Sequence, residues 1–237
     1  MRFDEAERRG SEYVNVDLSG VRLRNVDLTG AKVMEAMLVN ARFSGLIEGL
    51  VVNDIEVAPL IEAELDRRYP ERLKLRPSDA AGVREAWSVI EDMWAATKQR
   101  VNDLPEAILH ERVDDEWSCA ETFRHLVFVT DGWISGAVLG RTNHHHPFGM
   151  PPSYITDPER FGIEVDADPS IAEVIAARED RMATVRGVVD EVTDEDLERA
   201  CGEQGQHTVL SCLHTLFDEE WAHNQYANRD LDIVTRA

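Results

Sequence analysis

Acidic and histidine side chains are concentrated in one short segment near the C-terminus, HTLFDEEWAHNQY. On a helical wheel, Glu219 and His223 lie about 40° apart, and Glu220 and His223 about 60° apart, so either carboxylate could share a metal ion with His223. Two carboxylates and an imidazole beside an apolar helix face must be paired, protonated or bound to a cation. His214 is turned roughly half a turn away from His223 and is not expected to join this group.

A further histidine, His125, lies in the apolar segment EWSCAETFRHLVFVTDGW. It follows Ser118 and Glu121, whose spacing predicts a capping box at the start of a helix. We therefore expect Glu121 to cap the helix and not to bind a metal. On these residues alone an alternative stays open, in which His125 and His223 are hydrogen-bonded core histidines and the carboxylates form a solvated edge.

The pattern after residue 78 predicts the helices that would position these residues. A short extra helix is expected from Thr193, and no long alternating strand pattern follows residue 55, which favours an all-α four-helix bundle. A proline-rich connection, HHHPFGMPPSYITDPERFG, joins the second and third helices and is expected to cover the site or to cross the bundle. The four long helices are predicted at about 79–101, 118–139, 168–189 (with Asp168 as its cap) and 208–227.

The N-terminal part has a different period. A large apolar residue recurs at every fifth position from Tyr13 to Phe43, and a series of small apolar residues runs two positions earlier. A period of five fits neither a helix nor a strand, whereas a solenoid would stack both series into interior ladders. Between the repeat and the bundle, residues 55–77 predict a short connecting helix interrupted by proline.

Two resemblances follow from these residues. The combination E-W-S-x-x-E-T-x-R-H-L-V-F and H-x4-E-E-x-x-H-x-x-Y-x-x-R-D-L resembles the DinB/YfiT-like superfamily of metal-binding four-helix bundles. The pentads VDLSG, VRLRN and VDLTG resemble the pentapeptide repeats, which form a right-handed β-helix with four pentads per coil. The expected fold is therefore mainly α, a DinB-like four-helix bundle preceded by a short β-helix fragment. Its expected parts are a repeat segment at 1–54, a linker at 55–77 and the bundle at 78–237.

The DinB resemblance implies a metal site. In that family one histidine of the second helix and a His-x3-His pair of the last helix hold the metal. Carried over to this chain, these positions are His125, Glu219 and His223, so a carboxylate replaces the middle histidine. Two histidines and one carboxylate suit zinc, and also nickel or iron. Glu220 would be the general base, or would replace Glu219 as a ligand.

The resemblance also implies an activity. Related enzymes include thiol-dependent isomerases and S-transferases, in which the metal activates a low-molecular-weight thiol; hydrolysis by an activated water is the alternative. We therefore expect a metal-dependent transferase or hydrolase that acts on a small-molecule substrate. The competing interpretation is a non-catalytic interaction or stress-response protein, in which the repeat is a binding face and the metal site is degenerate.

The amino-acid composition limits the partners and the cellular location that can be expected for this protein. The formal net charge is −21, and residues 1–54 hold 9 acidic and 7 basic side chains, so nearly all the acidity lies after the repeat. This distribution argues against a DNA-mimicking repeat, and the charge disfavours nucleic acids and anionic membranes as partners. No apolar signal core or membrane span is evident, and three cysteines without a C-x-x-C pair suit a reducing compartment, so we expect a cytoplasmic protein. A homodimer suits this class of bundle, although no residue demands one.

Overall fold

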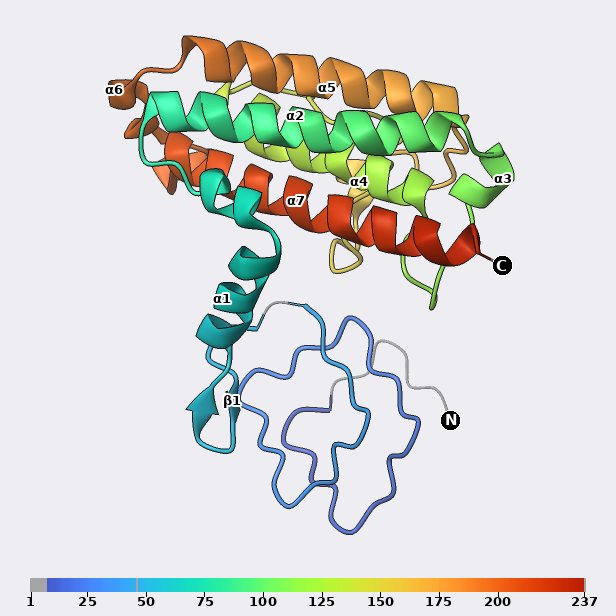
Figure 1. Ribbon diagram of the computed structural model, residues 1–237. Helices are drawn as coiled ribbons and strands as arrows, with labels where there is room; N and C mark the ends of the chain where they lie inside the picture. Colours follow the sequence, from blue (N-terminus) through green and yellow to red (C-terminus); the bar gives the residue numbers. More distant parts are fainter. Residues whose placement is uncertain (1–7, 46, 237) are drawn as a thin grey trace. The chain divides into compact units, whose positions relative to one another are not determined.

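The computed structural model describes residues 8–45 and 47–236. Its contacts divide the chain into two compact units, Met1–Ala41 and Arg42–Ala237, and each unit is described by itself. The second unit is mainly helical, as the sequence predicts (Figure 1). None of the helices formed by the described residues is long and apolar enough to cross a lipid bilayer.

The first unit is a series of regularly spaced corners. Gly20 has a φ angle of 71°, and Val21 N donates to Leu18 O at 3.0 Å. This is the geometry of a type II turn, whose third residue needs positive φ and therefore favours glycine. Between the glycine corners, Asn15 and Asn25 also adopt positive φ, which asparagine tolerates better than most residues. In the part of this unit that the structure describes there are turns and bends but no strand.

The second unit begins with a small hairpin and a surface helix. Strands β1 (Val51–Val52) and β2 (Ile55–Glu56) pair antiparallel, and α1 (Ala58–Arg68) and the 3₁₀ segment η1 (Pro70–Leu75) follow. The predicted connecting helix is therefore present. Helix α1 contributes no buried residue, but its Asp66 accepts hydrogen bonds from Arg72 and Arg76, both at 2.9 Å. Leu75 of η1 is only 2% exposed and joins the core of the helical region.

Four long helices lie side by side and enclose the main hydrophobic core (Figure 1). Each of them packs against at least two of the others, and the contact between α4 and α7 brings together the two helices that carry the predicted ligands. Each of these helices turns a stripe of apolar side chains toward the interior. Trp87, Leu126 and Phe217, which come from three different helices, are fully buried there. The long helices are α2 (Ala80–Asn102), α4 (Cys119–Thr130) with its continuation η2 (Asp131–Val138), α5 (Ile171–Glu191) and α7 (Val209–Val234).

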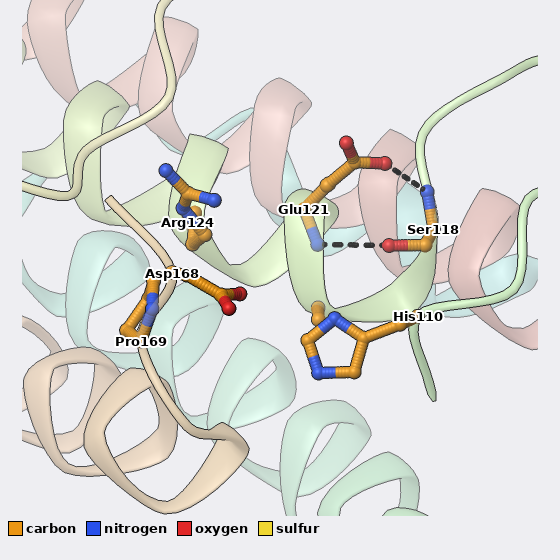
Figure 2. A pocket seen from close by; sticks show the side chains of 7 residues that line it. His110, Ser118, Glu121, Arg124, Asp168 and Pro169 are labelled. Carbon is orange, nitrogen blue, oxygen red and sulfur yellow. Dashed lines mark hydrogen bonds between the residues drawn. The ribbon is translucent and has the colours of Figure 1, made fainter. Parts of the chain in front are cut away.

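Polar caps determine where these helices begin. Ser118 accepts a hydrogen bond from Glu121 N, and the Glu121 carboxylate accepts one from Ser118 N, which confirms the predicted capping box (Figure 2). The predicted start of the third long helix at Asp168 is wrong, because α5 begins after Ser170. Ser170 and Glu173 form a reciprocal capping box that satisfies two backbone amides, and this box defines the first turn.

The second long helix changes its winding at Asp131, where α4 continues as the π-helical segment η2. Asp131 is fully buried and accepts hydrogen bonds from Arg181 Nε and from the His146 amide, both at 2.8 Å. The chain after η2 packs closely on this segment, because a Cβ atom at Gly136 would lie 2.5 Å from His144 Nε2. The sequence predicts the length of this helix but not its π-helical part.

The remaining elements are short. The helix predicted from Thr193 is present, with Thr193 as its cap. The strands were not predicted, because two-residue strands show no alternating pattern. These elements are α3 (Glu106–Leu109), η3 (Pro158–Phe161), α6 (Asp194–Leu197), β3 (Ala200–Cys201), η4 (Glu203–Gly205) and β4 (His207–Thr208).

Candidate metal centre

His125 of α4 and Glu219 and His223 of α7 come together across the contact of these two helices. Each offers one ligand atom, and these atoms all lie within 4.8 Å of one another. Glu219 Oε2 lies 3.6 Å from His125 Nε2 and 3.2 Å from His223 Nδ1, and the two imidazole centres are 4.7 Å apart. Within the part of the chain that the structure describes, this is the one group of three or more such side chains at this spacing.

The crossover loop fixes the ring of His125. His125 is 5% exposed, and its Nδ1 donates to the Met150 carbonyl at 2.8 Å. A carbonyl only accepts, so in the neutral ring this bond places the proton on Nδ1 and leaves a lone pair on Nε2, the nitrogen nearer to Glu219. The loop itself is bound to α4, because Arg124 Nε donates to Phe148 O at 2.9 Å and Met150 N donates to Arg124 O at 3.1 Å.

Glu219 is the charged member of the group. Burial acts to raise the pKa of this carboxyl, but the neighbouring His125 and His223 act in the opposite direction and outweigh it, so the pKa falls to about 2. Glu219 is therefore a carboxylate at neutral pH, the form that binds a cation. His223 Nδ1 also lies 2.9 Å from the Glu219 backbone carbonyl, the oxygen four residues earlier in the helix, and this bond orients the His223 ring.

Glu220 lies in a different environment from its neighbour. Its side chain is completely buried, and its Oε2 accepts a hydrogen bond from Arg178 Nη2 of α5 at 2.5 Å. Burial raises the pKa of Glu220, while the Arg178 charge acts in the opposite direction. Its Oε1 and the Nε and Nη1 atoms of Arg178 have no hydrogen-bond partner among the described residues. The role of Glu220 as a general base or alternative ligand stays a prediction, and its observed partner is an arginine.

Aromatic rings surround the histidines. The ring of Trp117 lies 4.4 Å from that of His125 and 6.2 Å from that of His223. Phe128 and Tyr226 lie further out, with ring centres 6.5 Å from His125 and 5.8 Å from His223 respectively. The approach of the Trp117 ring to His125 depends on the path of the chain before α4.

The other histidines lie outside this group. His214 of α7 donates from Nε2 to the Pro77 carbonyl at 2.7 Å, which agrees with its expected separation from His223. The consecutive histidines 144–146 lie in the crossover loop, as predicted. His145 packs between Phe128 and Phe161, at ring distances of 4.8 and 5.0 Å, and burial lowers its pKa from the usual 6.5 to about 4.

A separate polar pocket lies beside the first turns of α4 (Figure 2). Its volume is about 170 Å³, which is below the range of about 300–1,000 Å³ typical of small-molecule sites. Glu121, Arg124, Asp168 and His110 are among the residues that line it, and the Glu121 carboxylate is turned toward the Ser118 amide. The pocket shares none of its lining residues with the group of His125, Glu219 and His223.

Taken with the fold, this group defines a mainly helical protein with a candidate metal centre between two of its long helices. A family model of the DinB superfamily matches residues 89–227, more than half of the chain, and the chain belongs to this superfamily. A model of pentapeptide repeats matches residues 14–45. Both resemblances inferred from the sequence are thereby confirmed. Comparisons with curated proteins and with solved structures found no match.

Proposed function

We propose that this DinB-superfamily chain is a metal-dependent enzyme in which His125, Glu219 and His223 bind a divalent ion. The observation that carries the proposal is the convergence of three ligand atoms within 4.8 Å from two helices. The donor set fits such an ion, since two imidazoles and an ionised carboxylate are typical ligands of zinc. Nickel and iron are the alternatives with the same donor preference.

The side chains around the ion have distinct tasks in this proposal. The Met150 carbonyl holds the His125 ring in the tautomer that can bind, and the Glu219 carboxylate offsets part of the positive charge. When bound, a divalent metal supplies Lewis acidity and lowers the pKa of a thiol or water beside it. Trp117 screens one side of the histidines and would exclude water from a bound substrate. For such a site we propose a thiol-dependent S-transfer or a hydrolysis of a small molecule.

The proposal extends to the architecture. The side-by-side packing of α2, α4, α5 and α7 supports a DinB-type four-helix bundle as residues 78–237, with residues 55–77 as its linker. For residues 1–54 we propose a short right-handed β-helix. Leu18, Leu28 and Leu38 of the apolar series are 50%, 53% and 51% exposed. A stack of fewer than two coils would leave these side chains partly accessible to solvent, because few neighbouring coils cover them. Cytoplasmic location, no nucleic-acid partner and a homodimeric assembly remain part of this proposal.

A second candidate function is a binding module without catalysis. The bond between Glu220 and Arg178 favours it, because a carboxylate whose oxygen is held by an arginine is less free to accept a proton from a substrate. The half-exposed apolar residues of the repeat would then provide the binding face. Glu219 favours the enzyme over the binding module. No arginine or lysine within the described residues forms an ion pair with it, so its carboxylate is available to a metal ion.

A thermal-shift screen of the chain purified without chelator tests the function. The screen adds divalent zinc, nickel and iron singly, and then low-molecular-weight thiols to the metal-loaded chain. The enzyme proposal expects a higher melting temperature with one of the metals and a further rise with a thiol, because a ligand that binds only the folded state stabilises it. A higher melting temperature with a metal but no further rise with a thiol would favour hydrolysis over S-transfer. An unchanged melting temperature with every metal would contradict both enzymatic activities.

A further inference from the structure

Two cysteines that are far from a C-x-x-C spacing meet in the structure. The Sγ atoms of Cys201 and Cys212 lie 3.5 Å apart, in an otherwise apolar part of the core. Cys201 is in strand β3 and is 6% exposed, whereas Cys212 is in the first turns of α7 and is completely buried. Neither residue belongs to the candidate metal centre, and nothing in the proposed function uses them.

The backbone holds the two sulfurs together. Strand β3 pairs with β4, and Thr208 at the end of β4 is also the cap of α7, so the hairpin runs directly into the helix. Val209 N donates to Arg199 O at 3.1 Å and closes the base of the hairpin. Gly202 N donates to Ala137 O at 3.1 Å and anchors the other end of β3 on η2. The approach of Cys201 to Cys212 therefore follows from main-chain contacts on both sides of it.

We propose that Cys201 and Cys212 are a modification site, at which a low-molecular-weight disulfide converts the two thiols into a reversible intramolecular disulfide. A protein disulfide has a bond of about 2.05 Å, so the sulfurs must approach by roughly 1.5 Å, a movement within reach of side-chain rotation and small backbone shifts. The pair is separated by only one short hairpin and the first turn of α7. Closing the bond would fasten the hairpin to the helix that carries Glu219 and His223.

The chemistry balances as thiol–disulfide exchange. The Cys201 thiolate attacks one sulfur of the small disulfide, forms a mixed disulfide and releases one small thiol, which takes up the proton that Cys201 lost. The Cys212 thiolate then attacks the Cys201 sulfur, forms the intramolecular bond and breaks the mixed disulfide. This step releases the second small thiol, which takes up the proton of Cys212. Two protein thiols are oxidised and one small disulfide is reduced to two thiols.

Cys201 is the residue that reacts first. It lies in a two-residue strand, two positions before the exposed residues 203–206. Local opening of this hairpin would therefore expose Cys201 without unfolding the bundle. Burial raises the pKa of the Cys212 thiol to about 12, and its neighbour Cys201 acts in the same direction. Cys212 therefore stays a thiol in the closed structure and acts as the resolving residue once the hairpin has opened.

The test uses the full chain, folded and reduced, incubated with oxidised glutathione. We expect the intact mass to fall by about two units, about one of the three thiols to remain titratable after denaturation, and a peptide that links Cys201 with Cys212. The third cysteine is the matched control. Cys119 is buried in α4, and burial raises the pKa of its thiol to about 12, so Cys119→Ala should form the same disulfide.

Two further variants keep the test decisive. In Cys212→Ala the resolving thiol is missing, and Cys201 should accumulate as the mixed disulfide with glutathione; in Cys201→Ala no disulfide should form. The proposal is overturned if all three thiols of the folded wild-type chain survive, if the bond involves Cys119, or if it joins two chains. The wild-type measurement is sufficient on its own should either variant fail to fold. Because it is read from mass, its result is independent of metal binding.

Discussion

The buried pair of Glu220 and Arg178 makes a quantitative prediction that separates structural from catalytic roles. Arg178 is 5% exposed and Glu220 is completely buried, so Glu220→Leu leaves a guanidinium charge without its partner in the core. Removing one member of a buried ion pair costs about 3–5 kcal/mol of unfolding free energy. Arg178→Met should cost a similar amount, because it leaves the Glu220 carboxyl without a donor.

The double variant should behave differently from the sum of the single ones. Glu220 Oε1 and the Nε and Nη1 atoms of Arg178 have no partner among the described residues, and each unsatisfied buried polar atom costs about 1–3 kcal/mol. Leu and Met are close in volume to the side chains that they replace and bring no polar atoms. We expect the double variant to lie within about 2 kcal/mol of the wild type, which gives a coupling energy of several kcal/mol.

Urea unfolding followed by tryptophan fluorescence and by circular dichroism measures all four proteins. Glu179→Leu is the matched control, because Glu179 lies next to Arg178 on α5 but forms its ion pair with Lys98 on the surface, where such pairs contribute at most about 1 kcal/mol. A double variant that loses the sum of the two single losses would show that Glu220 and Arg178 are not energetically coupled. Metal content that is unchanged in the double variant would show that Glu220 is not a ligand.

The remaining predictions concern the junction at η2 and the crossover loop. Asp131→Leu should lower the unfolding free energy by about 3–5 kcal/mol, because it removes the buried carboxylate that binds both Arg181 and the His146 amide. Asp180→Leu, which removes an exposed partner of the same arginine, should cost below about 1 kcal/mol in urea unfolding. The pKa of His145 lies below its unfolded value, so the unfolded chain takes up the proton first and the unfolding free energy should decrease from about pH 6.5 to about pH 4. His145→Phe should reduce this decrease, and the same replacement at the more exposed His110 should not; equal pH profiles for both variants would contradict the assignment.

The parts of the fold that could be predicted are those that short-range chemistry determines. The capping box of Ser118 and Glu121 and the cap at Thr208 involve residues three positions apart, so the sequence marks the starts of α4 and α7. The same spacing is present at Ser170 and Glu173 and marks the start of α5, so the prediction of Asp168 as the cap overlooks a local signal. The π-helical segment that begins at Asp131 leaves no local pattern, and the bond between Asp131 and Arg181 joins residues far apart in the chain.

The same distinction holds for the candidate site. Helical spacing brings Glu219 and His223 together, and the family resemblance adds His125, so the sequence alone predicts the group that the structure assembles. The fixed ring of His125 could not be predicted, because its partner is a backbone carbonyl at Met150 and carries no side-chain signal. The approach of Cys201 to Cys212 could likewise not be predicted from the sequence, because it depends on a hairpin whose strands have only two residues each.

The binding of a divalent ion by His125, Glu219 and His223 is tested by the metal content of the chain purified without chelator, measured by inductively coupled plasma mass spectrometry. We expect about one divalent ion per wild-type chain, little in His125→Ala and in His223→Ala, and an unchanged content in His214→Ala. His214 is the matched control because it lies on the same helix as His223 and binds the Pro77 carbonyl. A wild-type chain without stoichiometric metal, or metal that persists in both His125→Ala and His223→Ala, would contradict the proposed centre.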